Sequence, residues 1–354
     1  MSLVFLLVLF CSCEKDNITE APANALVPTK GIRFIPNNST TNRTSVVNGM
    51  LAFDDVATFL STIETLANDA EAYDDDFVAK WNYLSDDDLE AKEIELGHNP
   101  DQPLVDFENQ FSGFTSLRKT IEVQLDNLIK NETLNDTNDP DDHFIMDNEV
   151  RTVLNADAQV MIGHSLFQMT MFGYVEVTDG DFNTLALVAS SDASTLNLPN
   201  VVISGGYYGS SSGNNTQTTP PGTPTDCRTD YYEINYKTTS SNRRIKGIQK
   251  LKGQNGIWGS KIKAKTKYQK KRWWGGWTSK RTTITATIDG QAFNQNCAQP
   301  SVPFKTKTKR KHKVKVTVTV PASANFWYKT KYHELKTIHK KDGNNNIIDD
   351  YFYE

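Results

Sequence analysis

Lysine recurs at every second position in two segments of the C-terminal half of this chain. The first segment carries Lys261, Lys263, Lys265 and Lys267, and the second carries Lys305, Lys307, Lys309, Lys311, Lys313 and Lys315. Because side chains alternate between the two faces of a β-strand, each segment is expected to place its lysines on one sheet face and Val314, Val316, Val318 and Val320 on the core side. Such a face would bind anions. The alternative is a solvated face that only protects the sheet against aggregation.

A tryptophan-rich turn lies between expected strands. Arg272, Trp273, Trp274 and Trp277 surround the pair Gly275-Gly276, which favours a tight turn. Exposed indoles stack on sugar rings, or lie at a membrane interface beside basic side chains. The alternative is that Trp273 or Trp277 closes the end of the core. No nucleic-acid-binding motif accompanies the turn, so no specific nucleic acid is expected as a partner.

The first residues indicate export. Leu3 to Phe10 is apolar but too short to span a bilayer, and Ser12 and Cys13 follow it. This stretch resembles a bacterial lipoprotein signal, which implies cleavage of residues 1–12 and a lipid on Cys13. The charged residues after the cysteine resemble Bacteroidota lipoproteins displayed at the cell surface. No lysine or arginine precedes Lys15, so we expect an upstream start that supplies a basic segment. The alternative is a buried N-terminal strand or helix.

Cys227 and Cys297 are the two remaining cysteines. An even pair in an exported chain favours a disulfide. In the chain-entropy model, closing a loop of roughly 70 residues contributes on the order of 4 kcal/mol. The alternative is two separate buried thiols.

Acidic clusters at 74–76, 86–88 and 139–143 suggest calcium binding, but none fits a calcium loop. Two further segments begin like such a loop, yet Thr184 and Ile347 stand where glycine is required. We therefore expect no metal and no cofactor. Zinc-protease, nucleophile-elbow, P-loop and dinucleotide motifs are also missing from the sequence, so no catalytic residue is nominated.

The net charge of −5 conceals two halves of opposite charge. Residues 1–226 hold 10 basic and 35 acidic side chains, whereas residues 227–354 hold 28 and 8. The segment 201–226 is rich in Gly, Ser, Pro and Thr, a composition typical of a linker. We expect a flexible stalk over 13–45, an acidic α+β domain over 46–200 and a basic β-rich domain over 227–354.

Helical periodicity dominates the start of the acidic half. A strand is expected at 49–53 and a helix after Asp54 and Asp55, followed by a second helix at 77–84 and a third capped by Ser85. A longer helix is expected over 116–130. The period then changes to two, which predicts a hairpin over 158–177 around Gly163-His164. Residues 50–54 and 154–163 resemble uncharacterised Bacteroidota lipoproteins, a resemblance that implies no known activity.

The basic half is strand-like throughout. Residues 281–288 predict a strand, and residues 334–340 and 347–353 predict a hairpin around Asp342-Gly343. Several short strands separated by turns favour a β-sandwich.

Three hypotheses follow for function. The first is a non-enzymatic, lipid-anchored outer-membrane protein, on the periplasmic face or at the cell surface, whose basic β-domain binds anionic glycan or lipid headgroups. The second is a structural protein whose basic half docks on its own acidic half or on a protein partner. The third is an unrecognised hydrolase.

Overall fold

A computed structural model of the chain describes residues 44–190, 197–204, 227–253, 256–301, 303–321, 323–324 and 326–353. The expected signal peptide, the lipidation site Cys13, most of the stalk and residues 205–226 of the linker lie outside the described residues. No helix in the described ranges is long and apolar enough to cross a bilayer.

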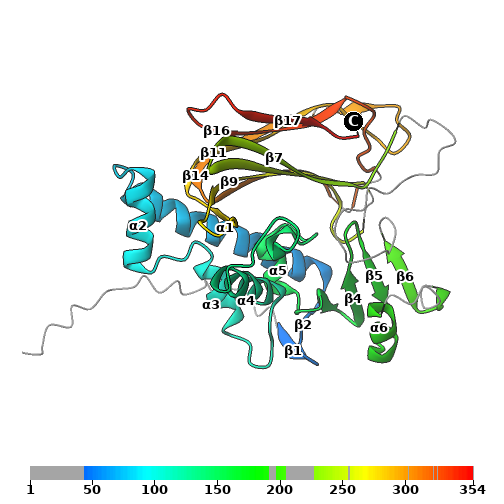
Figure 1. The fold of residues 1–354 in the computed structure, drawn as a ribbon. Helices are drawn as coiled ribbons and strands as arrows, with labels where there is room; N and C mark the ends of the chain where they lie inside the picture. Colours follow the sequence, from blue (N-terminus) through cyan, green and yellow to red (C-terminus); the bar gives the residue numbers. More distant parts are fainter. Residues whose placement is uncertain are drawn as a thin grey trace, which may run out of the picture. The chain divides into compact units, whose positions relative to one another are not determined.

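The N-terminal half is α+β, as the sequence predicts (Figure 1). Its sheet has the order β1 (Ser45–Val47), β2 (Met50–Phe53), β3 (Gln159–Ile162), β4 (Ser165–Met169), β5 (Tyr174–Val177), β6 (Val201–Ser204). Neighbours are antiparallel except β2 and β3. The helices are α1 (Val56–Lys80), α2 (Asp86–Leu96), α3 (Gln102–Glu108), α4 (Leu117–Lys130), α5 (Asn148–Val153) and α6 (Phe182–Ala189), with a 3-10 turn η1 (Pro140–Asp142).

Helix starts follow the expected capping chemistry. The Asp55 carboxylate accepts a hydrogen bond from the Thr58 amide at 2.7 Å, and the Ser85 hydroxyl accepts one from the Asp88 amide at 3.2 Å. Ser116 caps α4 in the same way. These side chains satisfy amides that have no partner inside the helix.

One helix differs from the prediction. The first expected helix and the start of the second, expected at 77–84, form the single 25-residue helix α1, which continues through Asp74, Asp75 and Asp76 and ends at Lys80. The buried carboxylate of Asp74 pairs with Arg281 of the basic half. Asp75 also pairs with Lys309 and Lys311, so two of the three adjacent aspartates have cationic partners that offset charge repulsion within the helix.

The C-terminal half is a two-sheet sandwich, which confirms the all-β prediction. One sheet has the order β10 (Trp277–Ser279), β9 (Ser260–Lys271), β8 (Arg243–Lys252), β7 (Tyr231–Ser240), with β15 (Lys313–Val320) also paired to β9. The other has the order β14 (Lys305–Lys311), β11 (Thr282–Gly290), β16 (Leu335–Lys341), β17 (Ile347–Tyr351). A short pair, β12 (Ala292–Phe293) and β13 (Pro300–Ser301), completes the half.

The sandwich core is built by alternate positions of both sheets. Ile262 and Ala264 of β9 pack in one cluster with Ile284 and Ala286 of β11. All four expected valines of β15 belong to this cluster or pack against it.

The second lysine segment is two strands instead of the single strand expected. β14 pairs with β11 in one sheet, and β15 pairs with β9 in the other. The change occurs at His312, whose imidazole lies 3.1 Å from the Glu93 carboxylate of α2. Contact with the acidic half therefore accompanies the bend.

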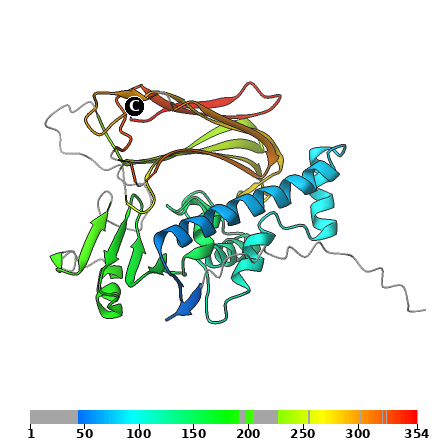
Figure 2. The ribbon, with the colours of Figure 1, turned by 180° about the vertical axis from the view of Figure 1, so that it is seen from behind.

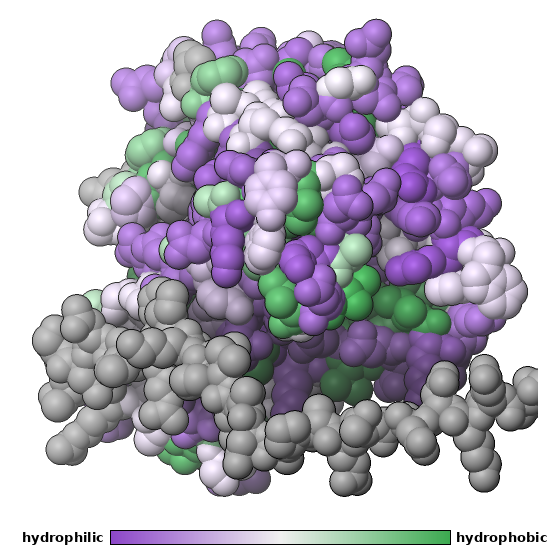
Figure 3. Space-filling model, turned by 90° about the vertical axis from the view of Figure 1, so that its left-hand side faces the viewer, coloured by the Kyte–Doolittle hydropathy of each residue, from purple (hydrophilic) through white to green (hydrophobic). Residues whose placement is uncertain are grey.

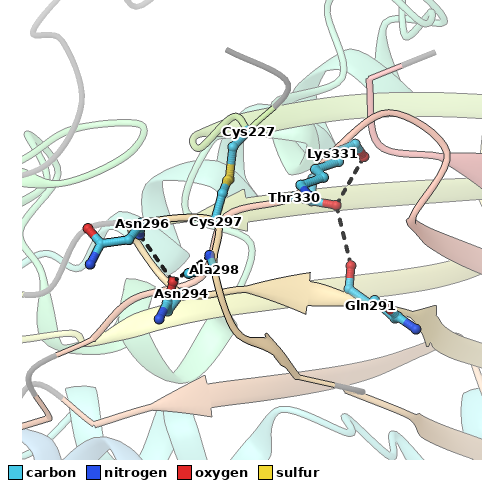
Figure 4. Close-up of a disulfide and its surroundings, with 8 residues drawn as sticks. All are labelled: Cys227, Gln291, Asn294, Asn296, Cys297, Ala298, Thr330 and Lys331. Carbon is cyan, nitrogen blue, oxygen red and sulfur yellow. Dashed lines mark hydrogen bonds between the residues drawn. A yellow bond between two sulfur atoms is a disulfide. The ribbon is translucent and has the colours of Figure 1, made fainter.

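Cys227 and Cys297 form the expected disulfide, with their Cα atoms 6.0 Å apart (Figure 4). This spacing is ordinary for a disulfide. The bridge ties the first described residue after 205–226 to the loop that follows β12.

The boundary between the halves lies later than expected. Val201–Ser204 forms β6 at the edge of the N-terminal sheet, so these four residues belong to the acidic half instead of the linker. Both halves pack into one compact unit over residues 42–354. Figure 2 shows α1 running beside the sandwich.

Candidate functional site

The outward face of the β8–β9–β15 sheet is a grid of cationic side chains. The strand register places Lys246 opposite Lys267, and Lys250 opposite Lys263. Lys315 of β15 lies opposite Lys265. Like charges directly opposite each other destabilise a sheet, so this grid needs counter-charges.

The segment from η1 to α5 supplies those counter-charges. Lys246 Nζ contacts the carboxylates of Asp139, at 3.1 Å, and Asp142. Lys267 pairs with Asp141, and Lys263 pairs with Asp147. The Asp147 carboxylate also accepts a hydrogen bond from Lys315 Nζ at 2.7 Å.

These contacts decide the protonation of the groups involved. Burial alone would raise the pKa of Asp141 and Asp147, but the adjacent lysines outweigh it and hold both values well below the usual range. Burial would lower the pKa of Lys246, but Asp142 and Asp139 raise it. Asp141, Asp147 and Lys246 are therefore charged at neutral pH, whereas burial lowers the pKa of Lys265 well below its usual value.

A second zone joins α1 and α2 to the sandwich. The fully buried Arg281 donates to Asp74 at 2.6 Å and also contacts Glu93. Around it lie the pairs Lys280–Glu90, Arg310–Asp86, Lys309–Asp75, Lys311–Asp75 and Lys307–Glu71. The aspartate clusters that suggest calcium are thus partners of the protein's own cations.

Asp74, Glu93 and His98 place three ligand atoms within 4.8 Å of one another. The guanidinium of Arg281 already bonds both carboxylates. His98 stacks on Phe77, with ring centroids 3.8 Å apart. The cluster is therefore better explained as a buried ion pair than as a metal centre.

The expected lysine face is covered by the acidic half of the same chain. Lys265 and Lys267 are each 2% exposed as side chains. Lys263, Lys307, Lys309 and Lys311 also pair with carboxylates, and Lys313 lies 3.5 Å from Asp101. Lys305 donates to the Thr317 carbonyl, and Lys261 lines a cavity.

Four cationic side chains of this face were not nominated from the sequence. Arg244, Lys246, Lys250 and Lys252 alternate along β8 and cover the sheet beside β9. The sequence pattern that indicates them is lysine or arginine at even-numbered positions of β8, with Ile245 and Leu251 between them. Ile248 interrupts this alternation, so the pattern is weaker than that of β9.

The three indoles of the tryptophan-rich turn lie in different environments. Trp273 is 83% exposed, whereas Trp274 is partly buried and its ring nitrogen finds no partner among the described residues. The Arg244 guanidinium stacks on Trp277 at 4.2 Å. Arg272 donates to Thr278 across the turn. One indole therefore faces solvent, and Trp277 packs against the basic face.

Comparison with known proteins gives little further guidance. No protein-family model matches the chain, and no curated protein matches it. A DUF4848 family protein from Bacteroides thetaiotaomicron, an uncharacterised Bacteroidota protein, aligns over 85% of this chain and 96% of its own length, at 13% identity and a TM-score of 0.21. A likeness this weak supports no statement about fold or function.

Proposed function

We propose that this chain is a non-enzymatic binding protein of the cell envelope that contacts acidic glycan through the β9–β10 turn. The observation that carries the proposal is the solvent-exposed Trp273 beside Lys270, Lys271 and Arg272. Among the described residues, none of these three cations forms an ion pair, whereas most lysines of the sheet face do. The turn thus presents cationic charge that the acidic half leaves available.

The composition of the turn favours glycan over lipid. Membrane insertion gains from several apolar side chains exposed together. Here a single indole is exposed among charged side chains, which suits stacking on one sugar ring with anionic groups beside it. Figure 3 shows one side of the molecule, which is mostly hydrophilic with a hydrophobic patch near its centre.

The proposal includes an anchor. A lipid on Cys13 and an outer-membrane location, on the periplasmic face or at the cell surface, agree with the sequence of the first residues. The disulfide agrees with export, since such bonds persist in oxidising compartments.

A second candidate function is structural. It is favoured by the ion pairs that join the acidic and basic halves, because they occupy most of the cationic face inside the chain. In this function the sandwich serves to fix the acidic half, and a protein partner would use another surface.

Binding of the full chain to a uronic-acid polymer tests the first proposal. We expect an affinity that falls steeply with salt, and a loss of about fivefold in Trp273→Ala, since an aromatic contact contributes about 1 kcal/mol. Lys270→Gln with Lys271→Gln should reduce the salt dependence.

Matched variants serve as controls. Tyr83→Ala removes another exposed aromatic ring, and Lys130→Gln removes another exposed lysine; both should bind like the wild type. Equal binding by Trp273→Ala and the wild type would contradict the proposal. If the protein binds anionic vesicles more tightly than the polymer, its ligand is lipid and not glycan.

A further inference from the structure

A cavity lies where the acidic and basic halves meet, away from the tryptophan turn. Its volume is about 60 Å³. Because one water needs at least about 10–15 Å³ on this measure, there is room for about four water-sized groups. The lining includes Lys250, Lys252, Lys261 and Trp258, with Met146, Met169, Met171 and Phe172 forming apolar walls.

Cationic charge exceeds anionic charge around this cavity. Of the facing carboxylates, Asp147 already pairs with Lys263 and Lys315, and Glu149 pairs with Lys315. Asp230 accepts a hydrogen bond from the Gly253 amide. Among the described residues, no carboxylate forms an ion pair with Lys250, Lys252 or Lys261.

The three lysines without a carboxylate partner make different contacts. Lys250 Nζ donates to the backbone carbonyls of Phe144, at 2.9 Å, and Met171. The ammonium groups of Lys252 and Lys261 lie over the Trp258 ring at 6.0 and 5.4 Å from its centroid. Lys252 is only 8% exposed, which is costly for a cation without a carboxylate partner.

Every other nearly buried lysine on this sheet face pairs with a carboxylate or lies near one. Lys250, Lys252 and Lys261 differ from them in this respect. We infer that the cavity is a binding site for one small oxyanion, namely a carboxylate, sulfate or phosphate group, held by Lys252 and Lys261. Such a group has the size of the cavity and supplies the missing negative charge. The source is either a free ion or the anionic group of a larger ligand.

Titration of the full chain with sodium sulfate, in parallel with sodium chloride at equal ionic strength, tests this inference. We expect sulfate to raise the thermal midpoint in a saturable way and chloride to do so less. Lys252→Met combined with Lys261→Met should abolish the difference. Lys270→Gln with Lys271→Gln, outside the cavity, should retain it, which separates this site from the glycan-binding turn.

Folding of the double variant is checked by its circular dichroism spectrum. If that variant does not fold, Trp258→Phe provides a second test, because it keeps the lysines and should alter sulfate affinity severalfold. The same sulfate response in the lysine variant and the wild type would overturn the inference, as would an equal response to sulfate and chloride. Competition by galacturonate at lower concentration than sulfate would identify a sugar acid as the source of the anion, and no competition would favour a free ion.

Discussion

The Asp141 carboxylate is contacted by three basic side chains. Arg151 donates to it at 2.7 Å, Lys265 lies 3.6 Å away, and Lys267 forms a closer pair. Burial lowers the pKa of Lys265 well below its usual value, although Asp141 opposes this, so the negative charge of Asp141 matters chiefly to Arg151 and Lys267. Both of these side chains are only 2% exposed and have little water to replace the carboxylate, whose own side chain is 20% exposed.

Asp141→Asn should consequently lower the free energy of unfolding by about 3–5 kcal/mol, because it leaves buried cations without a counter-charge. Urea unfolding measures the loss. Adding Lys267→Met should restore part of it, since one unpaired cation is removed. Glu95→Gln, at the exposed pair Lys92–Glu95, is the control and should cost less than about 1 kcal/mol. A loss below that value in Asp141→Asn would contradict the assigned role.

Sulfate affinity should depend on pH through the lysines of the cavity. Burial lowers the pKa of Lys250 to about 7 and that of Lys261 to about 8, and nearby Lys263 adds to both effects. Burial also lowers the pKa of Lys252 well below its usual value, and Lys250 and Lys261 add to that effect. As pH rises from 6 to 8 the amines of Lys250 and Lys261 lose protons, while sulfate keeps its charge. Affinity should therefore fall over this range, by at most about tenfold per pH unit for each proton taken up.

Three other titratable groups near the cavity also have shifted pKa values. Burial lowers the pKa of His143 to about 3, so that imidazole stays neutral between pH 6 and 8. The Asp147 carboxylate stays ionised, because Lys263 and Lys315 hold its pKa down against burial. Burial raises the pKa of Asp230. Calorimetry in two buffers of different ionisation enthalpy measures the protons taken up, and no uptake would refute the coupling.

At the scale of elements, β8 and β16 approach closely at one glycine. A Cβ atom on Gly247 would lie 2.5 Å from Cδ2 of His339, whose other ring atoms bond Thr266 and Thr337. The sandwich therefore needs glycine here to keep its sheet spacing.

Gly247→Ala should lower the free energy of unfolding by about 1–3 kcal/mol through overpacking. Thermal or urea unfolding measures this cost. The same change in a His339→Ala background should cost less, because the clashing ring is gone. Equal costs in both backgrounds would show that the ring is not the constraint.

Local elements were predictable because their signals are local. The caps Asp55 and Ser85, the helix expected over 116–130 and the hairpin around Gly163-His164 lie where the sequence places them. The single helix α1 and the division of 305–320 into two strands were not predicted, since both accompany contacts between the halves. Alternation showed which side chains share a face, but it carries no information about what covers that face.

At the scale of the whole molecule, the two halves act as mutual counter-ions. Residues 1–226 carry 25 more acidic than basic side chains, and residues 227–354 carry 20 more basic than acidic ones. Separating the halves would leave Arg281, Lys246 and Lys267 facing water on one side and their carboxylates on the other. Unfolding of one half should therefore remove the charge compensation of the other.

This dependence predicts cooperative unfolding by acid. Asp74, Asp141 and Asp147 have pKa values below the usual range, because nearby cations outweigh burial in each case. A depressed carboxyl pKa contributes stability that is complete above about pH 4 and is lost as pH falls towards the folded-state value. The loss should begin at both interface zones together.

Two signals distinguish the halves during an acid titration. Five of the six tryptophans lie in residues 227–354, and four of these report on the sandwich, because Trp258 packs on Phe59 of the acidic half. Far-ultraviolet circular dichroism follows the helices of the acidic half. Coincident midpoints are expected, because the ion pairs couple the halves. In 1 M sodium chloride the midpoints should still coincide, since buried pairs are screened less than exposed ones. Separate midpoints at low salt would show instead that each half is stable without the charges of the other.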